Sequence, residues 1–127
     1  MSSFTDKKVL VVDDMRSTRV LVEKALIKFG FGKENVVQAE NGKIACDHLG
    51  KNKFDLIISD LNMNEMDGAE LFIFCKENPE YKSIQFFMLS SDTDRARVST
   101  LFTMGLKHFI SKPLNESDLL KRINEIF

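Results

Sequence analysis

The pattern of apolar and polar residues alternates between two periods along the chain. Short apolar runs, typical of buried β-strands, occupy residues 8–12, 36–39, 55–59, 85–89 and 107–111. Segments in which apolar residues recur at helical spacing follow these runs and contain residues 18–29, 44–49, 71–75, 98–102 and 119–127. Glycine, asparagine and proline mark most of the boundaries. The pattern therefore predicts five strand–helix units without a repeat or a linker.

The order of these elements predicts an α/β fold. Strands that are apolar throughout and are separated by helices are typical of a parallel sheet covered on both faces. Right-handed crossovers between the strands then give a doubly wound sheet. In such folds the functional crevice lies beyond the carboxyl ends of the strands. The residues that directly follow each strand are therefore the candidates for a functional site.

Polar residues of complementary chemistry stand at these strand ends. Asp13 and Asp14 follow the first strand, Asp60 the third, Ser90 the fourth and Lys112 the fifth. One such residue alone usually caps a helix or forms a turn. Because carboxyl ends of parallel strands meet at one edge of a sheet, the whole set predicts a single polar cluster there.

Length, charge and cysteine content restrict the function further. A chain of 127 residues suits one domain, and we expect residues 1–127 to form it without an output domain. The net charge of −1 argues against general binding of nucleic acid. Cys46 and Cys75 lack the CxxC spacing of zinc and redox sites and are expected to be reduced thiols. No signal peptide or membrane-length apolar run is found, so we expect a cytoplasmic protein that does not enter a membrane.

The predicted cluster suits phosphoryl transfer to a carboxylate. Three neighbouring carboxylates repel one another unless one is protonated or a hard cation such as Mg²⁺ binds. A carboxylate can act as a nucleophile and carry a covalent aspartyl phosphate. A lysine ammonium and a serine hydroxyl suit phosphoryl oxygens. The metal and the lysine would offset charge during the transfer.

Three motifs in register resemble the receiver domain of two-component response regulators. They are VLVVDD near the start, LIISDLNMNEMDG in the middle and SKP near the end. The likeness extends over essentially the whole chain and is nearest to the single-domain chemotaxis type. It implies a flavodoxin-like fold, in which five helices surround a five-stranded parallel sheet of order 2-1-3-4-5.

The resemblance assigns metal-binding and phosphoacceptor roles to individual residues. It implies that Asp60 is the phosphoacceptor. It also implies that Asp14, Asp60 and the backbone carbonyl of Asn62 hold Mg²⁺, while Asp13 acts mainly through water. Gly68 matches the glycine that opens the following helix.

The resemblance also implies a conformational switch. Ser90 and Lys112 would contact the phosphoryl group, and Ser90 would move when the group arrives. Phe109, three residues before the lysine, would change between outward and inward rotamers. The surface of the fourth helix, fifth strand and fifth helix would then change. Val98 and Phe102 are placed inward by the helical period, or alternatively on this surface, where partners would bind.

Several positions depart from the family pattern. Asn64 stands in place of a common proline, which predicts a more mobile loop. Ser91 replaces a smaller residue and would narrow access to the phosphoryl group. Phe109 lacks a tyrosine hydroxyl. Asn62 and Asp92 stand at positions that tune dephosphorylation in the family, and they resemble the short-lived chemotaxis type.

The resemblance implies a stand-alone response regulator in a two-component phosphorelay, acting in chemotaxis or motility control. A histidine kinase or a histidine phosphotransfer protein would donate the phosphoryl group. Output would come from binding a protein such as a flagellar motor switch, with a phosphatase as a further partner. We expect a monomer that catalyses only its own phosphorylation and dephosphorylation.

Three other interpretations remain open. An aspartate-nucleophile phosphohydrolase of similar fold usually has a general acid two residues after the nucleophile, where this chain has Asn62. A flavodoxin-like cofactor binder would need a Ser/Thr/Gly-rich phosphate loop, where this chain has DDMRSTR. A degenerate receiver that only scaffolds would be expected to lack some of the five polar residues. Turnover of an external phosphoester would favour the first of these.

Overall fold

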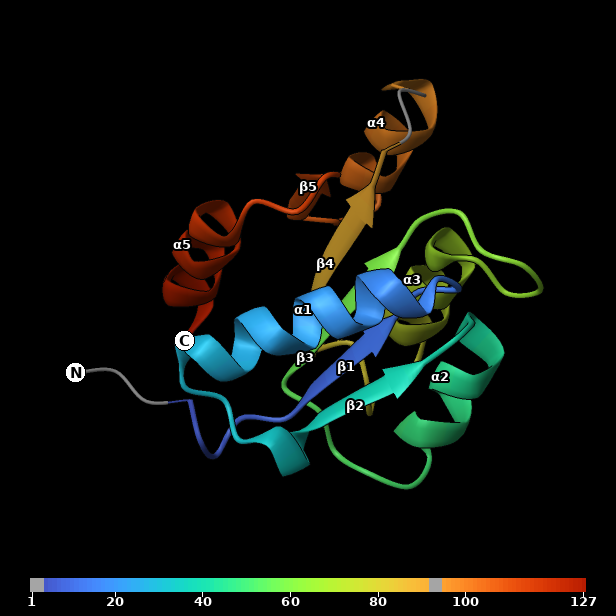
Figure 1. Cartoon of the computed structure of the whole chain (residues 1–127). Helices are drawn as coiled ribbons and strands as arrows, with labels where there is room; N and C mark the ends of the chain where they lie inside the picture. Colours follow the sequence, from blue (N-terminus) through green and yellow to red (C-terminus); the bar gives the residue numbers. More distant parts are fainter. Residues whose placement is uncertain (1–3, 92–94) are drawn as a thin grey trace.

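The computed structural model describes residues 4–91 and 95–127 (Figure 1). In this part of the chain, five strands form one parallel sheet with the order β2-β1-β3-β4-β5. The strands are β1 (Val9–Val12), β2 (Val36–Ala39), β3 (Leu56–Asp60), β4 (Gln85–Ser90) and β5 (His108–Ser111). The helices are α1 (Arg16–Phe29), α2 (Gly42–Leu49), α3 (Gly68–Glu77), α4 (Arg95–Thr103), α5 (Glu116–Ile126) and the short 3₁₀ helix η1 (Lys33–Asn35). The predicted fold class and strand order are confirmed.

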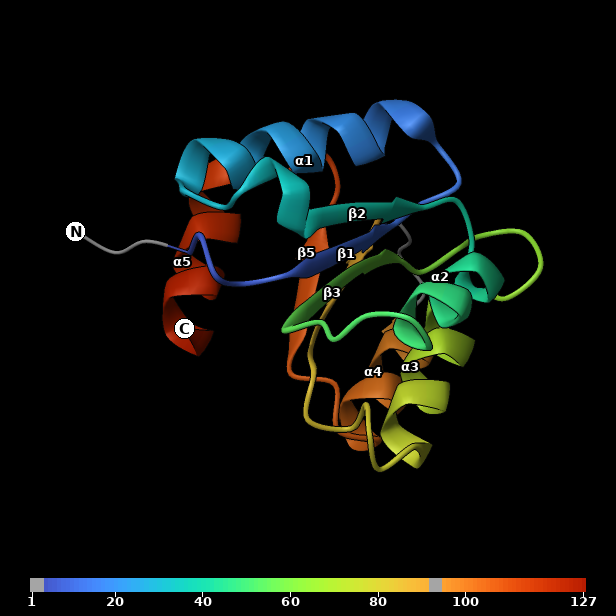
Figure 2. The ribbon, with the colours of Figure 1, turned by 90° about the horizontal axis from the view of Figure 1, so that it is seen from below.

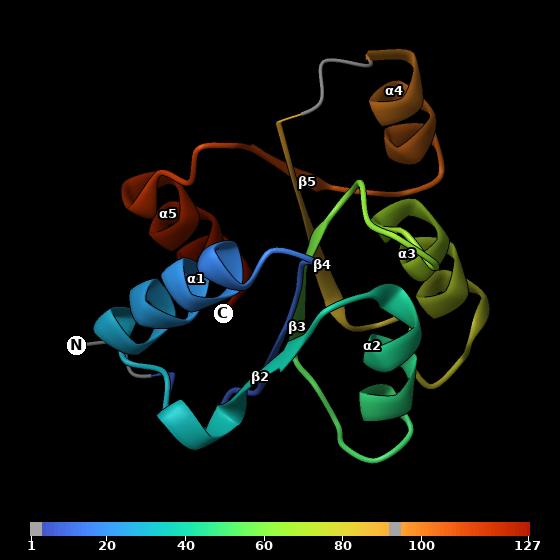
Figure 3. The ribbon, with the colours of Figure 1, turned by 45° about the vertical axis from the view of Figure 1, so that its right-hand side comes forward.

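Helices cover both faces of the sheet. α1 and α5 lie on one face, and α2, α3 and α4 lie on the other (Figures 2 and 3). Successive side chains of a strand point to opposite faces. Val9 and Val11 of β1 therefore belong to the core beneath α1 and α5, whereas Leu10 and Val12 belong to the core beneath the other three helices. A strand buried on both faces needs an apolar residue at every position, which explains the continuous apolar runs.

Local side-chain and backbone caps fix where the helices begin and end. The side chains of Asn41 and Asn115 each accept a hydrogen bond from the backbone of the first turn of α2 and α5. Asp67 and Glu70 form a reciprocal capping box at the start of α3. α1 ends at Gly30, whose φ of 114° is a left-handed conformation that suits glycine. No helix in the described residues combines the length and the apolar character that crossing a membrane requires.

Two details of the strand and helix assignment differ from the expectation. Asp60 and Ser90 are the last residues of β3 and β4, and so they belong to the sheet itself. In α4, Leu101 is buried and Val98 is partly buried, but 45% of the surface of Phe102 is exposed. Of the two placements expected for Phe102, the inward one is therefore wrong and the exposed one agrees with the structure. Adjacent helical residues project about 100° apart, so a helix that buries Leu101 turns Phe102 toward solvent.

The backbone ladder fixes the polar residues at the carboxyl edge of the sheet. Parallel hydrogen bonding continues one residue beyond three of the strands. The N–H of Asp13 donates to the carbonyl of Ala39 (3.1 Å). In the same way, the N–H of Leu61 donates to the carbonyl of Leu89 (3.1 Å), and the N–H of Lys112 donates to the carbonyl of Ser90 (2.9 Å). The strand ends are therefore aligned with one another, which positions the side chains described below.

We predict that Gly68→Ala destabilises the fold because α3 begins against the end of β3. The N–H of Gly68 donates to the carbonyl of Leu61 (3.0 Å), and an added Cβ would overlap the carbonyl oxygen of Asp60. We expect urea unfolding to show a loss of roughly 2–3 kcal/mol. Gly50→Ala is the matched control because the nearest atom to its Cβ would be 3.6 Å away, and we expect a change below about 1 kcal/mol. Equal stabilities of the two variants would contradict the prediction.

Candidate functional site

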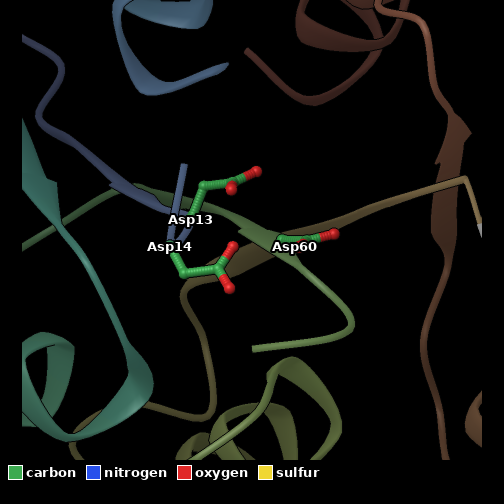
Figure 4. A group of neighbouring side chains, drawn as sticks. All are labelled: Asp13, Asp14 and Asp60. Carbon is green, nitrogen blue, oxygen red and sulfur yellow. The ribbon is translucent and has the colours of Figure 1, made fainter. Parts of the chain in front are cut away.

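Three carboxylates lie together at the carboxyl ends of β1 and β3 (Figure 4). One oxygen from each of Asp13, Asp14 and Asp60 lies within 4.8 Å of the others. Asp13 and Asp60 are buried, whereas Asp14 is exposed. Carboxylate oxygens are the ligands that Mg²⁺ prefers, together with water. The donor set and its one solvent-exposed member therefore fit a hard divalent cation.

Lys112 joins two of these carboxylates. Its ammonium nitrogen lies 3.0 Å from Oδ2 of Asp13 and 3.3 Å from Oδ1 of Asp60. The lysine follows β5, and both β4 and β3 lie between β5 and β1 in the sheet. Its long side chain therefore crosses the ends of the intervening strands and brings a positive charge into the acidic cluster.

Hydrogen bonds hold Asp13 in one orientation. Oδ1 accepts a bond from the N–H of Met15 (2.8 Å), while Oδ2 faces the ammonium group of Lys112. The backbone carbonyl of Asp13 accepts a further bond from the guanidinium of Arg19 (2.6 Å). Both carboxylate oxygens of Asp13 are thus already engaged within the protein.

The surroundings of Asp60 disfavour its charge. Burial raises the pKa of Asp60 above the ordinary aspartate value, and the negative charge of Asp13 adds to this effect. The ammonium of Lys112 and the N–H of Leu61, which donates to Oδ1 at 3.0 Å, oppose the rise without cancelling it. The positive charge of Lys112 and the hydrogen bond from Leu61 therefore offset only part of the cost of ionising Asp60 in this buried position.

The surroundings of Lys112 favour its charge. Burial alone would lower the pKa of the ammonium group, but the hydrogen bond and charge of Asp13, together with Asp60, raise it overall. Lys112 therefore stays protonated at neutral pH. A fixed positive charge beside Asp60 suits the binding of an anionic group such as a phosphoryl group.

The remaining predicted site residues lie on β4 and β5. Ser90 is buried at the end of β4, where its backbone pairs with that of Ser111. Phe109 pairs with Met88 one strand away and is partly buried against the core beneath α2, α3 and α4. Sequence reasoning did not single out Ser59, a buried residue of β3 whose hydroxyl donates to the carbonyl of Asp60 (2.9 Å).

A second residue that sequence reasoning missed contacts the loop between β3 and α3 from α4. Arg97 of α4 donates from Nη1 to the side-chain oxygen of Asn62 (2.7 Å) and from Nη2 to Asp67 (2.5 Å). Asn62 is exposed at the start of this loop, and Asp67 caps α3 at its end. Sequence spacing offers no signal for this contact, because Arg97 is 35 residues from Asn62 and belongs to no motif.

Several positions were expected to depart from the pattern of the family that the chain resembles. Asn64 and Ser91 are both exposed. Asp92 lies outside the described residues. Next to Asn64, Glu65 has a φ of 61°, a left-handed conformation that is uncommon for a residue other than glycine.

The two cysteines, Cys46 and Cys75, have thiol groups of low reactivity. Both are free thiols. Burial raises the pKa of Cys75 to about 12, with a smaller contribution from Cys46, and burial also raises the pKa of Cys46. Both groups are therefore protonated and unreactive at neutral pH.

We predict that Asp60→Asn stabilises the metal-free protein at neutral pH. A raised folded pKa means that the folded state binds more protons than the unfolded state, so stability falls as pH rises from the ordinary aspartate value through the raised one. Removing the charge should therefore raise the unfolding free energy by on the order of 1 kcal/mol, or about 4 °C in a thermal melt. The gain should shrink as the pH approaches the ordinary aspartate value.

Asp118→Asn is the control for this comparison. Asp118 forms a more exposed ion pair with Arg122 on α5, at 3.2 Å. Such pairs contribute less than about 1 kcal/mol, so this variant should show no gain in stability. A melting temperature of Asp60→Asn below that of the wild type at neutral pH would contradict the electrostatic argument.

Comparison with known proteins identifies the family. The family model of the response regulator receiver domain matches residues 9–124. The chain is 31% identical over 120 residues to the probable chemotaxis protein CheY of Rhizobium etli, covering 94% of this chain and 92% of the relative. It is 30% identical over 120 residues to the chemotaxis protein CheY1 of Helicobacter pylori, covering 94% of this chain and 95% of the relative.

A solved structure agrees with this result. The chemotaxis protein CheY4 of Vibrio cholerae superimposes with a TM-score of 0.85 at 32% identity, covering 95% of this chain and 98% of that one. The fold, the acidic cluster at the sheet edge and the match over residues 9–124 lead to the same conclusion. The chain belongs to the family of response regulator receiver domains.

Proposed function

We propose that Asp60 accepts a phosphoryl group from a histidine kinase or a histidine phosphotransfer protein, and that this event switches binding of a protein target. The observation that carries the proposal is the arrangement around Asp60. Its buried carboxylate has the ammonium of Lys112 at 3.3 Å and two further carboxylates within 4.8 Å. A nucleophile, a fixed positive charge and oxygen ligands for a cation are the parts that phosphoryl transfer to a carboxylate needs.

The transfer uses the carboxylate of Asp60 as nucleophile. One of its oxygens attacks phosphorus, and the bond between phosphorus and the imidazole nitrogen of the donor breaks. The electron pair of that bond leaves with the imidazole, which takes up a proton from solvent. Lys112 offsets the charge of the phosphoryl oxygens, and the buried hydroxyl of Ser90 donates a hydrogen bond to one of them.

Receiver domains bind Mg²⁺ at an acidic cluster of this kind. In this chain Asp14, Asp60 and the backbone carbonyl of Asn62 are the proposed ligands. Asp13 is proposed to act through water, because the N–H of Met15 and the ammonium of Lys112 already engage its two oxygens. When bound, the ion neutralises charge on the carboxylates and on the phosphoryl group.

We predict that Mg²⁺ stabilises the wild-type protein against unfolding and that Asp14→Asn removes most of this effect. At a Mg²⁺ concentration ten times the dissociation constant, the expected gain is about 1.4 kcal/mol. A thermal melt with increasing MgCl₂ measures it. Asp118→Asn also removes one carboxylate, but from α5, and should respond as the wild type does. A full response in Asp14→Asn would exclude this residue as a ligand.

The proposed output is a two-state change of the surface formed by α4, β5 and α5. Ser90 would move toward the phosphoryl group, and Phe109, which is partly buried, would change its rotamer toward the space that opens. The exposed ring of Phe102 gives this surface an apolar contact for a partner. A partner protein would thereby respond to phosphorylation of Asp60 without contacting Asp60 itself.

The pathway is proposed from the relatives, which are named chemotaxis proteins. We propose that the protein works as a monomer in the cytoplasm in control of chemotaxis or motility. The donor would be a histidine kinase, the target a protein such as a flagellar motor switch, and a phosphatase would assist the return to the resting state.

We predict that acetyl phosphate adds one phosphoryl group to the wild-type protein in the presence of Mg²⁺. Intact mass measured with and without Mg²⁺ detects the modification. Asp60→Asn should remain unmodified, since it keeps the shape of the side chain but lacks the nucleophilic oxygen. No modification of the wild type by acetyl phosphate or phosphoramidate, or an equal modification of Asp60→Asn, would overturn the proposal. Steady turnover of p-nitrophenyl phosphate would instead favour a phosphohydrolase.

A further inference from the structure

A cavity of about 240 Å³ lies at the amino edge of the sheet, opposite the edge that carries Asp60. It is bounded by the last turn of α3, the loop before β4 and the segment between α4 and β5. Gln85 and His108, the first residues of β4 and β5, line it from the sheet. One water molecule takes up about 30 Å³ in the liquid, so the cavity has room for a small ion or molecule.

The polar side chains that line this cavity can all donate hydrogen bonds. They include Lys76, Tyr81, Lys82, Ser83, Gln85 and Lys107. A lysine ammonium group only donates, and phenol, hydroxyl and amide groups can each donate as well. Among the described residues that line the cavity, none is an aspartate or a glutamate. A hollow with many donors and no carboxylate favours an anion as its occupant.

The charge of the three lysines is not balanced within the protein. Across residues 4–91 and 95–127, no ion pair includes Lys76, Lys82 or Lys107. The carboxyl ends of α3 and α4 lie beside the cavity, and each helix end contributes about half a negative charge. Two such ends offset only part of the charge of three ammonium groups. The cavity therefore keeps an excess of positive charge.

The ammonium group of Lys76 is placed at the wall of the cavity. Its nitrogen lies against Gly105, where an added Cβ would overlap it. Gly105 has a φ of 110°, a left-handed conformation that suits glycine. The same nitrogen lies 6.0 Å from the centre of the Phe72 ring, which also lines the cavity. The glycine thus leaves the space that the ammonium group uses, and the aromatic ring supports it from the other side.

We propose that this cavity binds a phosphate dianion, supplied either as inorganic phosphate or as the phosphate group of a small phosphomonoester. Such a group carries close to two negative charges at neutral pH and accepts several hydrogen bonds. Lys76, Lys82 and Lys107 would act on it as point charges, as lysines do in other phosphate sites. The site lies at the opposite edge of the sheet from Asp60 and does not depend on the proposed function.

The test uses the fluorescence of Tyr81. This residue lines the cavity and is the only tyrosine of a chain without tryptophan, so the signal reports on this region. Inorganic phosphate is titrated without Mg²⁺ at an ionic strength held constant with NaCl, and the fluorescence should change saturably in the millimolar range. A parallel titration uses glycerol 3-phosphate. Tighter binding of glycerol 3-phosphate would identify a phosphomonoester as the ligand, and tighter binding of inorganic phosphate would identify the free ion.

Matched variants separate this site from a general effect of charge. Lys76→Gln and Lys107→Gln should each bind phosphate about three- to tenfold more weakly, as expected for loss of one partly exposed bond from a charged donor. Lys121→Gln makes the same change on the exposed side of α5 and should bind as the wild type does. Lys112→Gln should also bind phosphate normally, because Lys112 lies at the carboxyl edge of the sheet.

Four results would overturn the inference. They are a response that does not saturate, equal affinities of the wild type and both cavity variants, a loss of binding confined to Lys112→Gln, and a saturable response to a glutamate-rich peptide with none to either phosphate compound. The third would place the anion at the acidic site, and the fourth would identify an acidic protein segment as the occupant. Saturable binding that weakens in Lys76→Gln and Lys107→Gln alone would support the inference. Labelling of Asp60 by acetyl phosphate is measured separately, so either conclusion can fail without the other.

Discussion

The ammonium group of Lys112 is the contact on which the acidic site depends. Two buried carboxylates, Asp13 and Asp60, face the same space, and Lys112 lies within 3.3 Å of an oxygen of each. Burial of a charge without a partner is costly, so this single positive charge makes the arrangement possible. It does not balance the site completely, because the pKa of Asp60 remains raised. The remaining imbalance favours a cation beside Asp60.

The parallel sheet brings these charged side chains together at one edge. A sheet buried on both faces must be apolar along its length, and its polar residues are therefore confined to the strand ends. The ladder extends one residue past three strands, which aligns the backbones of Asp13, Leu61 and Lys112 with their neighbours. Rigid strands thus hold side chains from distant parts of the sequence with little freedom. Such a scaffold suits a site that has to bind a metal and a phosphoryl group in fixed positions.

The loop between β3 and α3 joins the site to the rest of the molecule. Gly68 fits against the carbonyl of Asp60, so the start of α3 is in direct contact with the end of β3. On one side the loop is bonded to α2 through Met66, and on the other to α4 through Arg97. α4 buries only Leu101 among its nine residues, so its other interactions contribute much of its attachment. The loop is thus the segment through which the end of β3 is bonded to both α2 and α4.

The sequence by itself determined the order of the elements, the fold class and the polar residues at the strand ends. These features are local: hydrophobic period and strand termini are visible in a few consecutive residues. The exposure of some residues, such as Phe102, could not be predicted from the neighbouring sequence. The apolar stripe of α4 is weak, so the way in which this short helix packs on the sheet decides which side chains face solvent.

The contacts between distant residues belong to the tertiary structure. The pairing of Lys112 with Asp13 joins residues 99 apart, and that of Arg97 with Asn62 joins residues 35 apart. The direction of the pKa shift of Asp60 follows from burial and from the distances to Asp13 and Lys112. No local pattern encodes such distances, because they arise only when the strands are assembled side by side and the helices are packed on them.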